Sequence, residues 1–121
     1  RLTIEELKAL KKQGINIFAP PMWALLAVNG AGEVVPSDYA TDIMRAGLDI
    51  ITWTFERADL RQGASNAGWY YQFDPEGKAI KTDSDMYKAL DVLARKFARH
   101  IEHNPKLVSS ITSFPYVLNS L

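Results

Sequence analysis

The sequence predicts an α/β fold with parallel strands, because one helix-to-strand pattern occurs twice along the chain. The segments Gln13–Ile17 and Ala46–Ile50 align at a spacing of about 33 residues, and each passes from a helical pattern through a glycine into an apolar strand pattern. A strand–helix unit of a parallel sheet needs about 30 residues or more, so the spacing fits such a unit. The repeat by itself does not distinguish a closed barrel from an open doubly wound sheet.

The first helix is predicted to begin after Thr3. Glu6 follows three residues later, as in a capping box in which each side chain bonds the backbone amide of the other residue. Apolar residues recur at helical spacing up to Gly14, where a left-handed C-terminal cap is expected. The run 15–19 is predicted to be a buried strand, and Pro20-Pro21 ends it because proline cannot donate to a strand ladder.

The second helix and strand follow a loop of small residues at 29–32. Ser37 is a candidate N-cap, and Gly47 is expected to end the helix. Residues 48–55 give the strongest strand pattern, with β-branched and aromatic residues and almost no polar interruption. Such a run is typical of a parallel strand that is buried on both faces.

The last part of the chain is predicted to contain a long loop, a helix and a third strand. The loop at 58–82 carries the aromatic run Trp69-Tyr70-Tyr71, which favours an ordered loop. A helix is expected from Ser84, its N-cap, to about Glu102. Residues 107–114 are the predicted third strand.

Composition excludes several classes of protein. The chain has 121 residues, the size of one ordinary domain, and its 14 basic and 14 acidic residues leave no net charge. The basic footprint of a nucleic-acid-binding protein is therefore absent. There is no cysteine, which excludes disulfides and thiolate sites. No apolar run approaches about 18 residues, so no membrane span is predicted.

Five segments occur together in a recognisable order. They are Gly14–Ile17 leading into Pro20–Trp23, then Val35–Ala40, Ala46–Arg57, Gly68–Gln72 and Asp85–Tyr87. In this order they resemble the C-terminal part of the glycerophosphodiester phosphodiesterases, in a bacterial and fungal branch of that family. The resemblance covers roughly residues 2–97.

Members of this family are TIM barrels with the active site at the C-terminal ends of the strands. The resemblance implies that residues 1–121 form a single partial domain, the C-terminal portion of a TIM (β/α)8 barrel with about three parallel strands. It also implies metal-dependent hydrolysis of glycerophosphodiesters to glycerol 3-phosphate and an alcohol, with Ca²⁺ or Mg²⁺. The expected partners are this small-molecule substrate and the remainder of the barrel.

The catalytic residues implied by the resemblance do not fall on this chain. The family's two histidines and most of its metal-binding carboxylates come from early strands, and no residue here matches them. The segment Thr112–Pro115 resembles the family's Thr-Asp-x-Pro, with Ser113 where the aspartate is expected. We therefore expect the isolated chain to be inactive and assign it no catalytic residue and no metal ligand.

The substrate-binding candidates are three tryptophans and one glutamate. Trp53 matches the family's tryptophan at the end of the seventh strand, which packs against the glycerol or leaving-group side of the substrate. Trp23 follows two prolines and can form a pocket wall, Trp69 can stack on a sugar or polyol, and Glu56 can reach a substrate hydroxyl. Each has a structural alternative: packing for Trp53 and Trp23, anchoring of the loop for Trp69, and an ion pair with Arg57 for Glu56.

Two other groups of polar residues are better explained by helix ends. His100 and His103 could bind a metal weakly, but solvated histidines also favour a helix C-terminus. Asp83 and Asp85 lie beside Ser84, where acidic residues interact favourably with the helix dipole.

Two alternatives to an enzyme stay open. One is a non-enzymatic polyol- or sugar-binding module derived from such a barrel, which the Ser113 substitution favours. The other is a truncated product with no function of its own, since the chain opens at Arg1 as a cut or processed end would. The resemblance favours a secreted or cell-envelope location, and unpaired strand edges predict self-association.

Overall fold

A computed structural model describes residues 1–53, 59–62 and 68–103, and at positions 62 and 97–103 it describes the backbone only. The helices are α1 (Ile4–Lys12), α2 (Asp38–Arg45) and α3 (Met86–His103). The strands are β1 (Ile17–Phe18), β2 (Leu26–Val28), β3 (Val34–Pro36) and β4 (Asp49–Ile50). Short 3-10 helices are η1 (Met22–Ala24), η2 (Leu60–Gln62), η4 (Gly68–Tyr71) and η5 (Asp83–Asp85).

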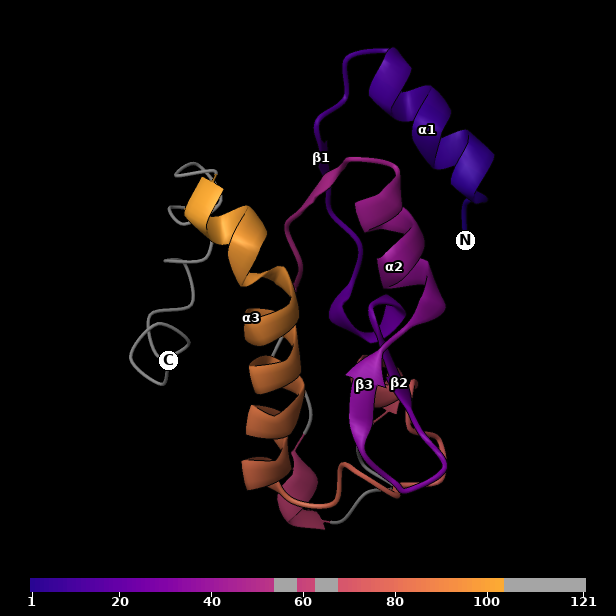
Figure 1. The fold of residues 1–121 in the computed structure, drawn as a ribbon. Coiled ribbons are helices and arrows are strands. Elements are labelled where there is room, and N and C mark those ends of the chain that lie inside the picture. Colours follow the sequence, from indigo (N-terminus) through magenta and orange to yellow (C-terminus); the bar gives the residue numbers. More distant parts are fainter. Residues whose placement is uncertain (54–58, 63–67, 104–121) are drawn as a thin grey trace.

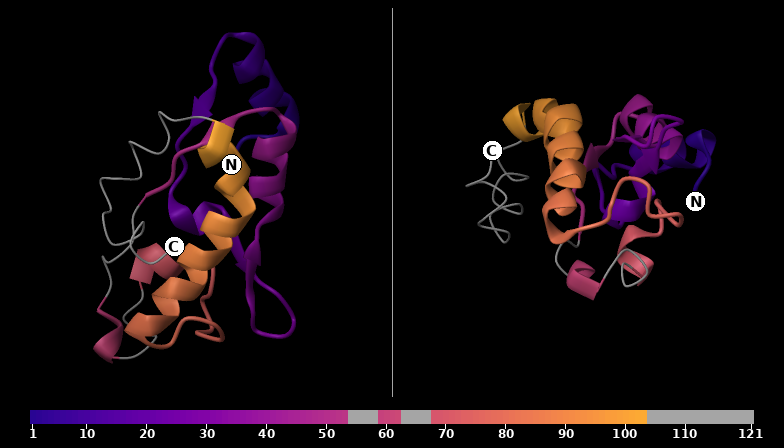
Figure 2. Two further views of the ribbon diagram at one scale, coloured as in Figure 1. Left: turned by 60° about the vertical axis from the view of Figure 1, so that its left-hand side comes forward. Right: turned by 90° about the horizontal axis from the view of Figure 1, so that it is seen from below.

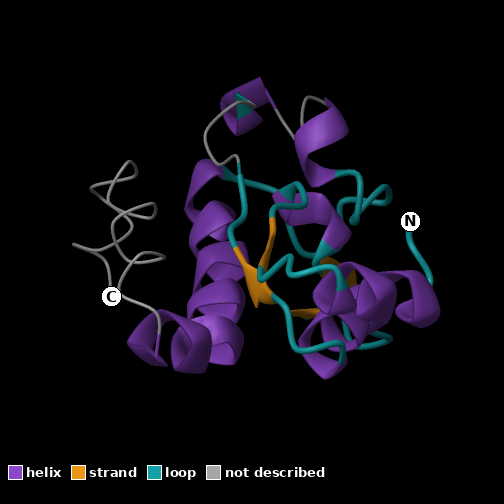
Figure 3. Ribbon diagram, turned by 90° about the horizontal axis from the view of Figure 1, so that it is seen from above, coloured by secondary structure: helices purple, strands orange, loops and turns teal. Residues whose placement is uncertain are grey.

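The β1–β4 pair lies between α3 on one side and α1 and α2 on the other (Figure 1 and Figure 3). Helix α3 packs against β3 and β4, and α1 packs against α2. The hairpin of β2 and β3 projects away from α1, at the opposite end of the molecule (Figure 1 and Figure 2). No helix in the described ranges is both long and apolar enough to cross a membrane.

The prediction that the chain forms a portion of a TIM barrel with about three parallel strands is wrong. The described residues form two separate sheets of two strands each, and they do not close into a barrel. Only β1 and β4 are parallel, in the register Ile17 to Asp49 and Phe18 to Ile50. Strands β2 and β3 pair with each other in the antiparallel direction. The predicted third strand at 107–114 lies outside the described residues.

The parallel strands are also shorter than predicted, at two residues each. Pro20-Pro21 follows β1 closely and, having no N–H, cannot extend its ladder. The run 15–19 was expected to be a buried strand, and this is wrong for β1, since Ile17 is 38% exposed. Beyond β1 and β4 the two segments meet once more, in an isolated parallel bridge between Pro21 and Trp53.

The hairpin was not predicted, although its turn has a clear local cause. The Asn29 side-chain carbonyl accepts hydrogen bonds from the amides of Ala31 and Glu33, at 3.0 and 2.9 Å. Gly32 has φ of 78°, which a residue without a Cβ adopts readily. Strands β2 and β3 pair with each other and do not join the β1–β4 pair.

The predicted helix caps are confirmed in the first two helices. Thr3 and Glu6 form the capping box of α1, with bonds of 3.2 Å to the Glu6 amide and 2.7 Å from the Thr3 amide. Ser37 caps α2 by accepting from the Ala40 amide at 3.1 Å. Gly14 and Gly47 follow the two helices with φ of 91° and 80°.

Helix α3 begins differently from the prediction, since Thr82 rather than Ser84 stands at its entrance. The Asp85 carboxylate accepts hydrogen bonds from the amides of Lys81 and Thr82, both at 2.9 Å, and pairs with Lys88 at 2.6 Å. Burial acts to raise the pKa of Asp85, but the bonds from Lys88, Lys81 and Thr82 outweigh it and lower the pKa to about 2. The carboxylate is therefore a structural anchor of the helix start.

One continuous core joins all these elements. Its fully buried members include Leu7 of α1, Ile43 of α2, Leu48 before β4, Ile80 of the loop and Ala89 of α3. Such burial contributes roughly 1.5–3 kcal/mol for each large apolar side chain.

Candidate functional site

The candidate site lies where β1 and β4 end, and Trp53 is its fixed point. The indole Nε1 of Trp53 donates to the Ala19 carbonyl at 3.1 Å, and the Trp53 carbonyl accepts from the Met22 amide. One residue earlier, the Thr52 hydroxyl donates to the Pro20 carbonyl at 3.0 Å. Because Pro20 and Pro21 carry no donor, these bonds hold the segment after β1 in place of a longer strand ladder.

Four aromatic side chains meet at this end of the strands, and we call Trp23, Trp53, Trp69 and Tyr70 the tryptophan cluster. Trp69 is its centre: it stacks on Trp53 with centroids 5.9 Å apart and an interplanar angle of 28°. It meets Trp23 and Tyr70 edge-on, at 5.4 and 5.3 Å. Trp53 stays 40% exposed and Trp69 48% exposed, so a large part of the stacked pair faces solvent.

Trp69 is carried by a loop that is anchored on its C-terminal side. Tyr71, two residues on, is only 2% exposed and belongs to the core. Buried Asp74 then accepts hydrogen bonds from the amides of Lys78, Ala79 and Ile80, at 2.8–2.9 Å. The described part of the loop from residue 68 onward is therefore an ordered structure that presents the exposed indole, as the aromatic run predicted for this part.

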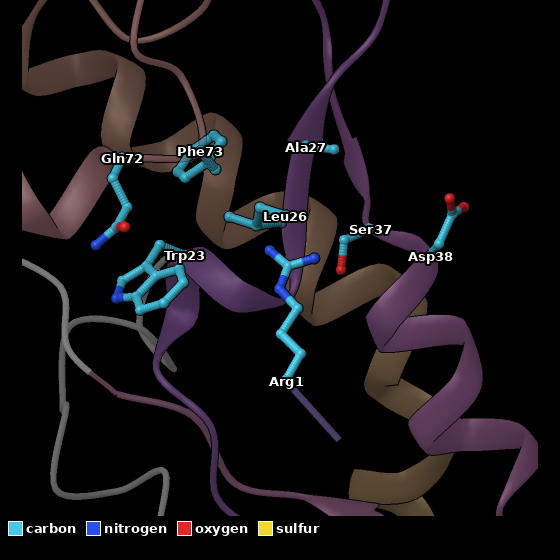
Figure 4. A pocket seen from close by; sticks show the side chains of 8 residues that line it. All are labelled: Arg1, Trp23, Leu26, Ala27, Ser37, Asp38, Gln72 and Phe73. Carbon is cyan, nitrogen blue, oxygen red and sulfur yellow. The ribbon is translucent and has the colours of Figure 1, made fainter. Parts of the chain in front are cut away.

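A cavity of about 320 Å³ lies beside the cluster and shares Trp23 with it. Its other lining residues are Arg1, Leu26, Ala27, Ser37, Asp38, Gln72 and Phe73 (Figure 4). The Arg1 side chain reaches between Trp23 on one side and Ser37 and Asp38 on the other (Figure 4). The lining thus carries one cation and one carboxylate, and it favours neither anions nor cations by charge alone.

Two polar groups lie at the rim of this cavity, on Gln72 and Trp23. The Gln72 amide nitrogen donates to the Trp69 carbonyl at 2.9 Å, which fixes the carboxamide beside the cluster. The indole nitrogen of Trp23 is buried and finds no acceptor among the described residues. An unpaired buried donor costs roughly 1–3 kcal/mol.

Of the four substrate-binding candidates from the sequence, the structure brings Trp23, Trp53 and Trp69 into contact. Glu56 and its possible partner Arg57 lie outside the described residues. Helix α3 includes His100 and His103, but their side chains also lie outside the described part. Reasoning from the sequence missed the cavity residues Ser37 and Asp38, since the N-cap pattern fully explained both.

The residues present do not fit the divalent metal that the resemblance implies. Within the described ranges, no group of three or more His, Cys, Asp or Glu is placed to hold a metal ion. The carboxylates with lowered pKa are occupied elsewhere: the pKa of Asp59 falls to about 2 because Arg61 bonds it through its side chain and its amide. Asp85 anchors α3. A metal that takes part in the reaction would need ligands from outside the described residues.

The chain is similar to a protein of Arthroderma benhamiae that is named "Extracellular protein". The two are 38% identical over 87 residues, which make up 72% of this chain and 35% of that protein. The chain thus spans about a third of the length of the curated relative it matches. No family model matches the chain, and no solved structure matches it.

Proposed function

We propose that this chain is part of a secreted glycerophosphodiester phosphodiesterase, in which the tryptophan cluster forms one wall of the substrate site. One observation carries the proposal. Three of the segments that resemble the family, Pro20–Trp23, Ala46–Arg57 and Gly68–Gln72, are far apart in the sequence, and the structure brings their tryptophans into contact. A shared site accounts for why these three segments resemble the family together.

The chemistry assigned to this chain is binding and not bond cleavage. In the reaction, water adds to phosphorus, the bond from phosphorus to the alcohol oxygen breaks, and that oxygen takes up a proton. The proton-transferring groups and the ligands of the metal would come from residues outside the described part of the chain. The exposed faces of Trp53 and Trp69 would cover apolar C–H groups of the substrate and exclude water from one side of it.

Secretion is part of the proposal and has separate support. The similar Arthroderma protein is named as extracellular. The family resemblance favours the same compartment.

The test uses the native protein that carries this chain, purified from its source. Release of glycerol 3-phosphate from glycerophosphocholine and glycerophosphoinositol would be measured with Ca²⁺ or Mg²⁺ and after chelation. We expect turnover that needs the metal. In a recombinant form, Trp69→Ala should raise KM about tenfold, because the lost contact binds ground state and transition state alike.

A matched control is Tyr87→Ala, which removes an aromatic side chain that is 47% exposed on α3. It should leave KM unchanged. Absence of turnover in the native protein would overturn the proposal. Binding of a glycerol phosphate without turnover would instead favour the non-enzymatic polyol- or sugar-binding module.

A further inference from the structure

We propose that the stacked pair Trp53 and Trp69 is a platform for a cyclic polyol, so that the preferred diester carries a ring alcohol such as inositol. The claim that the bound ring is part of a phosphodiester rests on the proposed function. The binding preference itself follows from the shape of the pair and is tested without any hydrolysis.

The two indoles form a step with uncovered faces. Rings in direct face-to-face contact would lie about 3.5–4 Å apart, whereas these centroids are 5.9 Å apart at 28°. A sideways displacement together with the tilt accounts for this distance, and such an arrangement leaves part of each face uncovered. The exposed fractions of 40% and 48% agree with this arrangement.

The ring positions are fixed before any ligand binds. The hydrogen bond from Trp53 Nε1 to the Ala19 carbonyl sets the orientation of one indole. Edge contacts with Trp23 and Tyr70 restrict the other. A ligand that is itself rigid then loses little conformational entropy on binding, which favours a ring over an open chain such as glycerol.

The chemistry of the platform fits a neutral ring. A cyclic polyol directs its hydroxyls outward at the rim and presents C–H groups on its faces, so one face can lie flat on an indole. The platform and its two edge partners are all uncharged side chains. The carboxamide oxygen of exposed Gln72, held beside the cluster through its bond to Trp69, can accept from a rim hydroxyl.

The same geometry provides no aromatic cage for a quaternary ammonium group such as choline. Aromatic cages hold such a cation between converging rings, each with its centroid within about 6 Å of the charge. Here the ring centroids themselves are only 5.3–5.9 Å apart, so the rings contact one another and leave no space for a cation between them.

The experiment is a titration of the protein that carries this chain, followed by the indole N–H resonances of Trp23, Trp53 and Trp69, which are assigned by single substitution. The probes are myo-inositol, methyl β-glucoside, glycerol and choline chloride at equal concentrations. We expect the two ring compounds to shift the Trp53 and Trp69 resonances, and Trp69→Ala to weaken their binding about threefold to tenfold. Trp69→Phe keeps an aromatic face and should fall between, whereas Tyr87→Ala should bind as the parent does.

Stronger binding of choline or equal binding of glycerol would overturn the inference. Ring binding that survives in Trp69→Ala would overturn it as well. Should Trp69→Ala disturb the fold, the comparison of Trp69→Phe with Trp69→Leu decides, because only the first keeps a ring. If the native protein turns over the diester but does not bind the ring compounds, this inference is wrong and the proposed function stands. If it binds the ring compounds but shows no turnover, the proposed hydrolase function is wrong and this inference on ring binding stands.

Discussion

The side chain of Trp53 and the backbone of Ala19 are joined by a hydrogen bond of 3.1 Å across 34 positions of sequence. This bond ties the chain after β4 to the chain after β1 at the point where the strand ladder stops. It makes Trp53 a structural residue as well as a candidate for binding, so the two roles must be separated by choice of substitution.

Replacement of Trp53 by phenylalanine keeps an aromatic ring and removes the donor. We expect the free energy of unfolding to fall by about 1 kcal/mol, because the Ala19 carbonyl loses this partner. Urea denaturation measures the change. Tyr87→Phe on α3 is the control and should stay within about 0.5 kcal/mol of the parent; an equal loss in both variants would show that the hydrogen bond contributes nothing.

Ser37 makes two buried hydrogen bonds, and both should matter for stability. Its hydroxyl donates to the Ala24 carbonyl at 2.7 Å and accepts from the Ala40 amide at 3.1 Å. Ser37→Ala should cost about 1–3 kcal/mol, since it leaves both groups unpaired. Thermal unfolding checks this against exposed Ser84→Ala, and a neutral Ser37→Ala would contradict the prediction.

Gly47 is expected to be needed for its backbone conformation alone. Its φ is 80°, while a Cβ built there would meet only the end of the Lys11 side chain at 3.8 Å. Gly47→Ala should therefore destabilise by roughly 1 kcal/mol through backbone strain and not through a clash. Gly30→Ala is the matched control, because Gly30 has open space around it and lies outside the left-handed region. Equal stability of the two variants in urea would count against this reading.

Acid should weaken the start of α3 through Asp85. The pKa of this carboxyl is about 2 in the folded chain, below the value of about 3.9 in unfolded peptides. A lowered pKa means that its contribution is complete above about pH 4 and is lost as the pH falls through 2. The stability difference between the parent and Asp85→Asn, about 1–2 kcal/mol at pH 6, should shrink across that window. Urea midpoints from pH 6 to pH 2 measure it, with Asp91→Asn as control; a constant difference would refute the assignment.

The free edge of β1 should drive self-association. In the described part of the chain β1 pairs with β4 alone, and Ile15 before the strand and Ile17 within it are each 38% exposed. An unpaired apolar edge can pair with another chain, and a charged residue there opposes it. Sizing chromatography over a concentration series should show association that Ile17→Lys reduces and Tyr87→Lys does not. A sharp monomer peak for the parent at every concentration would disprove this.

The local features of the fold could be predicted from the sequence because their causes lie within a few residues. The capping box of Thr3 and Glu6, the Ser37 cap and the glycines after α1 and α2 each depend on one helix turn. The long helix near the C-terminal end was also expected to within about two residues. Its cap was not, because Thr82, Ser84 and the acidic residues beside them offer several competing starts.

Sheet architecture depends on partners far away in the sequence, and it was predicted poorly. The run 48–55 reads as a long strand, yet a strand extends only as far as its partner does, and Pro20-Pro21 shortens that partner. The hairpin was missed because β2 and β3 are only three residues long, too short for a clear alternation. Three tryptophans of the candidate site were named from the sequence, but their contact with one another depends on the tertiary fold.

The register of β1 and β4 has a consequence for the order of folding. Ile17 meets Asp49 across more than 30 positions, whereas Leu26 and Pro36 of the hairpin are only ten positions apart. Closing the longer loop costs more chain entropy, and non-local pairings form more slowly than local ones. The hairpin and the helices should therefore form first, and the Trp53 indole should reach the Ala19 carbonyl, 34 positions away, only in the last, slowest phase. Tryptophan fluorescence in a stopped-flow experiment would then report the end of folding, after the far-ultraviolet circular dichroism has already reached its native value.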